Sequence, residues 1–185
     1  NTLFLTDPQY AKLAPYTARQ AGIYKCPADM SQVDILNRKF PRVRSVSMSV
    51  AMGDPAGEGW LNYYGTSPTS YRTFFKTQDL NVSGVRPSDI HVFLDEHPDS
   101  INDGAFAVQM AQPTDATARI IDFLASYHNG ACGFSFSDGH SEIHKWIGSK
   151  IKARVDYTGT MPLNVDAGDS FKDVLWMSEV TTVKN

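Results

Sequence analysis

Histidine and carboxylate side chains gather between residues 128 and 144, and both are residue types that bind zinc. The set is His128, Asp138, His140 and His144. If the intervening residues form a strand that rises about 3.3 Å per residue, His128 and Asp138 lie about 20 Å apart. On a second strand, His140 and His144 would be separated by about 13 Å. One zinc ion cannot reach ligands so distant, so we expect solvated polar groups, and a metal-dependent hydrolase is the weakest functional hypothesis.

Two acidic segments offer the oxygen ligands that calcium prefers. Residues 99–104 superficially resemble a calcium loop, but Ile101 takes the third position and Met110 the twelfth, where a bidentate Glu is required. An irregular calcium site near this segment stays open as an alternative to a polar turn. Asp166 and Asp169, in a loop before the last predicted helix, are candidate calcium ligands. The same two residues equally suit a solvated loop that caps the helix.

The chain has two cysteines, Cys26 and Cys132, far apart in sequence. A disulfide between them would close a long loop and stabilise the fold by about 4–5 kcal/mol in the chain-entropy model. Two buried free thiols would fit the sequence as well. Cys132 lies in an apolar strand pattern with no base at a fixed offset, which disfavours a nucleophile.

An aromatic group lies in and beside the Gly- and Pro-rich stretch of residues 53–70. It comprises Trp60, Tyr63, Tyr64 and Tyr71. These rings form a candidate surface for a sugar or a protein partner, although packing over a loop is the default for such residues. No nucleophile elbow, phosphate loop or dinucleotide fingerprint is present.

Composition indicates one globular domain over residues 1–185. Hydrophobic residues make up 42% and charged residues 20%, and the formal net charge is -3. No block of like charge stands out, so nucleic-acid binding is not expected. No apolar run approaches the roughly 20 residues that span a bilayer, and no signal peptide opens the chain.

The elements that position these residues are strands with short helices near both ends. Alternation of apolar residues with serine predicts a half-buried strand over residues 42–52, and residues 90–94 and 105–110 are further strand candidates. Asp7 and Pro8 resemble a helix start. A capping-box pattern predicts a second helix over residues 170–178. The predicted fold class is α+β with an antiparallel sheet.

Two turn signals bracket the segment from 127 to 147. Asn129-Gly130 and Asp138-Gly139 are strong hairpin dipeptides, and the residues between them alternate. A two-residue second loop would pair Ser135 with Glu142 and Phe134 with Ile143. The segment is therefore predicted to be an antiparallel meander, with His128 and Asp138 at its successive turns.

Six fragments in order carry a family resemblance: Cys26-Pro27-Ala28-Asp29, Arg44 to Ser49, Phe93 to Asp99, Tyr127 to Gly130, Phe134 to His140 and Asp173 to Met177. His128, nine intervening residues and Asp138-Gly139 match an H-x(9)-D-G signature. The chain thus resembles prepilin-like proteins, the pseudopilins of type II secretion and the type IV pilins.

The resemblance implies a pilin-like head that works as a structural or assembly subunit, not as an enzyme. It implies an extracytoplasmic location, with other pilin-like subunits, secretion-apparatus proteins or exported cargo as partners. Membrane attachment would come only through an N-terminal hydrophobic helix that is absent from the sequence. Major pseudopilins carry calcium in a C-terminal loop, which is why Asp166 and Asp169 are retained. The alternative function is an extracellular module that binds carbohydrate or protein.

Overall fold

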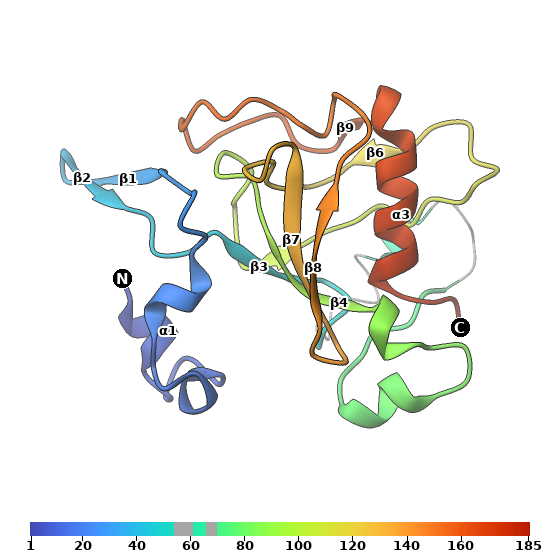
Figure 1. The fold of residues 1–185 in the computed structure, drawn as a ribbon, viewed down its shortest axis with the longest axis horizontal. Helices are drawn as coiled ribbons and strands as arrows, with labels where there is room; N and C mark the ends of the chain where they lie inside the picture. Colours follow the sequence, from blue (N-terminus) through green and yellow to red (C-terminus); the bar gives the residue numbers. More distant parts are fainter. Residues whose placement is uncertain (54–60, 66–69) are drawn as a thin grey trace.

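The fold is α+β, as predicted, and it is built on one five-stranded sheet (Figure 1). The computed structural model describes residues 1–53, 61–65 and 70–185. The strand order is β5-β3-β4-β7-β8, with β3 and β5 parallel and the other neighbours antiparallel. The strands are β3 (Val46–Ser49), β4 (His91–Asp95), β5 (Ala105–Phe106), β7 (Ala131–Phe136) and β8 (Ser141–Lys145).

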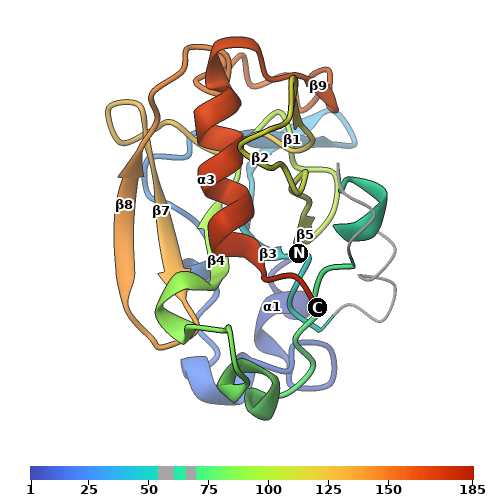
Figure 2. The same cartoon turned by 90° about the vertical axis from the view of Figure 1, so that its right-hand side faces the viewer.

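The helix α3 (Phe171–Thr181) covers one face of this sheet (Figure 2). Phe134 of β7 meets Trp176 edge-on at 5.2 Å between ring centroids, and Val174 and Met177 are buried with it in the larger core cluster. A short two-stranded sheet, β6 (Arg119–Ile120) with β9 (Val165–Asp166), lies beside α3. Among the described residues, no helix is both long and apolar enough to cross a bilayer.

The predicted second hairpin is present, but its register differs by one residue. Ser135 pairs with Ser141 and Phe134 with Glu142, because the loop has three residues instead of two. Gly139 adopts φ +94°, the left-handed conformation that closes a three-residue hairpin loop. On its other side β7 pairs with β4 and not with a strand preceding Asn129-Gly130. The predicted meander is therefore wrong in its first half: β7 and β8 form a single hairpin, and the Asn129-Gly130 turn does not join two paired strands.

In β3, the serine side is the buried side. Ser45, Ser47 and Ser49 are each at most 1% exposed, whereas Met48 is 38% exposed. Serine can be buried at low cost only when its hydroxyl finds a hydrogen-bond partner. Ser47 does so, because its Oγ bonds the buried Glu96 carboxyl group.

Residues 1–41 form an arm that stands apart from the body of the molecule in Figure 1. It contains α1 (Leu3–Thr6) and an exposed hairpin of β1 (Gln32–Ile35) and β2 (Arg38–Pro41). The predicted helix start at Asp7 is wrong, since Asp7 is the C-cap of α1 and is followed by turns. Short 3-10 segments also occur among the described residues: Ala14–Thr17, Ala21–Tyr24, Thr77–Asn81, Pro87–Asp89 and Gly168–Ser170.

Candidate metal centre

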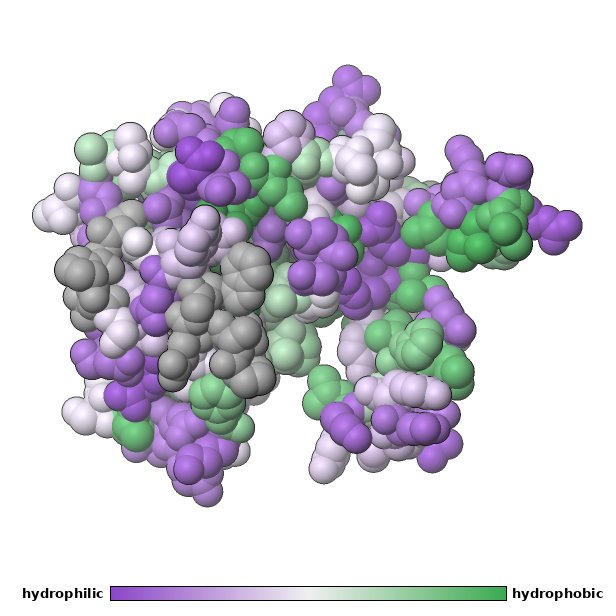
Figure 3. All heavy atoms as spheres, turned by 180° about the vertical axis from the view of Figure 1, so that it is seen from behind, coloured by the Kyte–Doolittle hydropathy of each residue, from purple (hydrophilic) through white to green (hydrophobic). Residues whose placement is uncertain are grey.

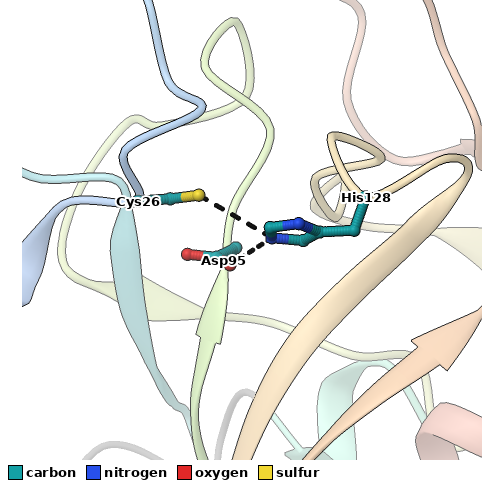
Figure 4. Close-up of side chains that lie close together, drawn as sticks. All are labelled: Cys26, Asp95 and His128. Atoms are coloured by element: carbon teal, nitrogen blue, oxygen red, sulfur yellow. Dashed lines mark hydrogen bonds and ion pairs between the residues drawn. The ribbon is translucent and has the colours of Figure 1, made fainter.

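Three side chains from distant segments converge where the arm meets the sheet (Figure 4). His128 Nε2 lies 3.7 Å from Cys26 Sγ and 3.7 Å from Asp95 Oδ2. The three ligand-type atoms all lie within 4.8 Å of one another. Cys26 is buried, and the other two residues are half-buried. The described residues thus contain a Cys/Asp/His group that could hold a metal ion.

The backbone around each of these residues is held by local hydrogen bonds. Cys26 begins a turn in which Pro27 takes the second position and the Asp29 N–H donates to the Cys26 carbonyl at 3.0 Å. The Cys26 N–H in turn donates to Ser45 Oγ at 2.7 Å. This second bond ties the arm to the residue that precedes β3.

Asp95 is the last residue of β4, and its carbonyl accepts hydrogen bonds from the Ala125 N–H and from Cys132 Sγ. His128 lies in a tight turn, because Asn129 and Gly130 both have positive φ, at +56° and +78°. The Gly130 N–H closes the turn onto the Ser126 carbonyl. The predicted Asn-Gly turn therefore places the imidazole at the start of β7, beside the end of β4.

Burial shifts Cys26 and Asp95 toward their neutral forms as long as no cation is bound. Burial raises the pKa of the Cys26 thiol above its ordinary value. Burial also raises the pKa of Asp95, although the nearby His128 opposes this shift. A positive ion among the three atoms would reverse the preference, because it stabilises a thiolate and a carboxylate.

The geometry differs from that of a thiol hydrolase. A nucleophile and an orienting carboxylate act on opposite ring nitrogens of a catalytic histidine, whereas Cys26 and Asp95 both face Nε2. That nitrogen carries either one proton or one lone pair, so it cannot serve two partners fully. The 3.7 Å separation from Asp95 is also longer than a nitrogen–oxygen hydrogen bond. Three atoms that approach one another at this spacing suit a shared cation better.

The four residues first considered for zinc do not assemble. The group of three metal-binding side chains among the described residues includes His128 but not Asp138, His140 or His144. Asp138 and His140 contact each other beyond the far end of β7, with 2.6 Å between Oδ1 and Nδ1. His144 stacks on Trp176. His128 and Asp138 flank β7 at opposite ends, as predicted.

The acidic segment that follows β4 is buried, not a solvated turn. Glu96 and His97 are fully buried, and burial raises the pKa of Glu96 to about 8. Asp99 accepts hydrogen bonds from the N–H groups of Asp156, Tyr157 and Gly159. Burial alone would raise the pKa of Asp99, but these three bonds hold it below its ordinary value. The segment is thus a structural network, and each carboxyl group has protein partners.

Asp166 and Asp169 also bind backbone groups. Asp166 Oδ1 accepts from the Gly168 N–H at 2.8 Å. The Asp169 carboxylate accepts from the N–H groups of Ser149 and Lys150, and these bonds lower the pKa of Asp169 to about 2. Neither aspartate belongs to a group of three metal-binding side chains among the described residues. The geometry therefore gives calcium at this loop no specific support.

Cys26 and Cys132 are both free thiols, so the two do not form a disulfide. Cys132 is fully buried, and its Sγ donates to the Asp95 carbonyl at 3.1 Å. Burial raises the pKa of Cys132 well above its ordinary value. The Cys132 thiol therefore contacts the backbone carbonyl of Asp95, whereas the Cys26 thiol lies near the side-chain carboxylate of the same residue.

The predicted aromatic surface is not a continuous one. Tyr71 is 3% exposed and packs in the second core cluster, so it cannot stack on a sugar. Tyr63 is exposed and meets Tyr64 edge-on at 4.9 Å between ring centroids. Trp60 lies outside the described residues.

Sequence reasoning missed Asp95 as the partner of Cys26 and His128. The available signal was that three of the six fragments behind the resemblance each contain one of these ligand-type residues. A scan against protein-family models and searches of curated proteins and of solved structures found no match to the chain.

Proposed function

We propose that the chain is the exported head of a pilin-like filament or secretion subunit, and that its role is assembly and not catalysis. The observation that carries this proposal is the apolar surface of the arm. Of the sixteen large hydrophobic side chains exposed among the described residues, ten belong to residues 1–41. Tyr16 is 86% and Leu36 92% exposed. Figure 3 shows hydrophobic residues along this arm. A dense apolar surface of this kind is typical of a protein–protein interface.

A groove beneath the arm adds to this surface. It has a volume of about 650 Å³ and runs between the arm and the outer face of the sheet, the face that α3 leaves uncovered. Its apolar lining includes Leu13 and Ile23 of the arm and Val46, Phe93 and Ile143 of the sheet. We assign the arm and groove to contacts with another pilin-like subunit.

The placement of the resemblance fragments also supports the proposal. Four of them contain or flank the neighbouring strands β3, β4 and β7, and a fifth lies in α3, which covers those strands. The fragments therefore describe one structural unit, as expected if the resemblance concerns a fold. Calcium is not part of this proposal, because a thiol and an imidazole do not suit that ion.

The test uses the full-length gene product in a cell with a prepilin peptidase. We expect an upstream prepilin cleavage site followed by an apolar helix, and recovery of the processed protein in sheared filaments or in crosslinked complexes with other pilin-like subunits. A reading frame without that site and helix would overturn the proposal.

A paired comparison tests the arm itself. Tyr16→Ser with Leu36→Asn removes its two most exposed large side chains, and Asn is compatible with the φ of +53° at residue 36. The control, Tyr63→Ser with Ile147→Asn, changes residues of similar exposure outside the arm. Assembly should fall for the arm variant alone, at unchanged thermal stability. Equal assembly of the two variants would show that the arm is not the contact.

A further inference from the structure

We propose that Cys26, Asp95 and His128 form a zinc site that fastens the N-terminal arm to the β-sheet. The inference rests on the convergence of three ligand atoms and is independent of filament assembly. Thiolate, imidazole and carboxylate are the three protein ligand types that zinc accepts, whereas calcium and magnesium select oxygen.

The spacing of the ligand atoms matches a tetrahedral zinc site. Zinc bonds of about 2.0–2.3 Å at tetrahedral angles place neighbouring ligand atoms about 3.3–3.6 Å apart. The observed separations from His128 Nε2 are 3.7 Å to Cys26 Sγ and 3.7 Å to Asp95 Oδ2. The third pair, Cys26 Sγ and an Asp95 carboxylate oxygen, lies within 4.8 Å, so small side-chain movements would bring all three atoms onto one ion. Three protein ligands leave the fourth position for water.

The charges also balance. A Cys26 thiolate and an Asp95 carboxylate carry two negative charges, and a neutral His128 adds none. A divalent cation therefore makes the half-buried group neutral overall, which removes the cost of placing two anions side by side.

The position of the site gives it a structural role. Cys26 belongs to the arm, Asp95 ends β4 and His128 precedes β7, so one ion would join three segments. Near Cys26 the arm is attached by two hydrogen bonds, from the Cys26 N–H to Ser45 Oγ and from the Ser45 N–H to the Tyr24 carbonyl. Beyond them the groove separates arm and sheet. A zinc ion at this hinge would hold the arm in place.

The experiment measures binding of Zn²⁺ to the purified, reduced and chelator-treated chain by calorimetry and elemental analysis. We expect one Zn²⁺ per chain, and a loss of affinity of more than about tenfold in Cys26→Ser, Asp95→Asn and His128→Gln. His140→Gln is the matched control, since His140 also contacts an aspartate but lies beyond the far end of β7. It should bind Zn²⁺ like the wild type.

Cobalt binding to the wild type tests the site without depending on whether a ligand variant folds. Co²⁺ bound to the wild type should show thiolate-to-metal charge-transfer absorption, and Cys132→Ala should keep it. Zn²⁺ should also slow proteolysis and amide exchange within residues 1–41. Absence of stoichiometric Zn²⁺, absence of the thiolate band, or equal affinity in the wild type and all three ligand variants would overturn the proposal.

Discussion

Gly133 of β7 determines how closely Asp95 can approach its partners. A Cβ atom at this position would lie 3.2 Å from Asp95 Oδ2, which is tighter than an ordinary van der Waals contact. The backbone of Gly133 lies in the strand β7 and its φ is not positive, so the requirement for glycine comes from space and not from conformation. The missing side chain leaves room for the carboxylate beside His128.

Gly133→Ala should therefore weaken Zn²⁺ binding by about tenfold, the size of effect seen when residues around metal ligands are changed. The added methyl group displaces the Asp95 carboxylate and leaves the other two ligands in place. Calorimetry measures the affinity, and Gly104→Ala is the control, because a Cβ at Gly104 meets nothing within 4 Å. Equal affinities in the two variants would mean that Asp95 is not a ligand.

At this scale the sequence identified two of the three residues but not the contact among them. Cys26 and His128 stood out, as a possible disulfide partner and a turn marker, whereas Asp95 was covered only by the fragment Phe93 to Asp99. Cys26 and His128 are 102 positions apart, and only the pairing of β4 with β7 and the return of the arm bring them together. No local pattern encodes such a contact.

Among the elements, the N-terminal end of α3 serves as a clamp for the loop that follows β8. The clamp consists of Asp169, Ser170 and Asp173, which together accept hydrogen bonds from five consecutive backbone N–H groups, those of residues 147–151. The predicted capping box is absent, since Ser170 makes no side-chain cap and its Oγ binds the Ile151 N–H. A Cβ at Gly148 would lie 2.1 Å from Ser170 Oγ, so the loop and helix touch.

Asp173→Asn should destabilise the protein by about 2–3 kcal/mol, because an amide replaces one of two carboxylate acceptors with a donor. Both acceptors are in use, by the N–H groups of Ile147 and Gly148 at 2.8 Å, and Asp173 is 1% exposed. Urea denaturation measures the change, with Glu179→Gln on the exposed side of α3 as the control. A loss no larger than that of the control would contradict the clamp.

The elements were easier to predict in kind than in detail. The hairpin dipeptides correctly placed β7 and β8, but the three-residue loop around Gly139 shifted the register. In β3 the alternation is present, but the pattern alone does not show that the serine side is the buried one. The buried Glu96 instead draws Ser47 inward, and a residue 49 positions away cannot be read from the strand itself.

Across the whole molecule, buried titratable groups make stability depend on pH in opposite directions. Burial lowers the pKa of His91 to about 4, so its contribution to stability is lost as pH falls from about 6.5 toward 4. Burial raises the pKa of Asp122 to about 6, from 3.8. The folded state therefore holds the Asp122 proton more tightly, and this contribution is lost as pH rises from about 4 through 6. Between these limits the two slopes have opposite signs.

Asp122→Asn should reveal how much Asp122 contributes to the pH dependence of stability. Asn keeps an oxygen that can accept from the Ala107 N–H, which Asp122 Oδ2 now binds at 2.7 Å, but it no longer titrates. The stability of the variant relative to wild type should rise by about 2–3 kcal/mol between pH 4 and pH 7, a little below the full value of the pKa shift. Urea denaturation at intervals of half a pH unit measures it. A difference that is flat from pH 4 to 7 would show that Asp122 does not hold its proton in the folded chain.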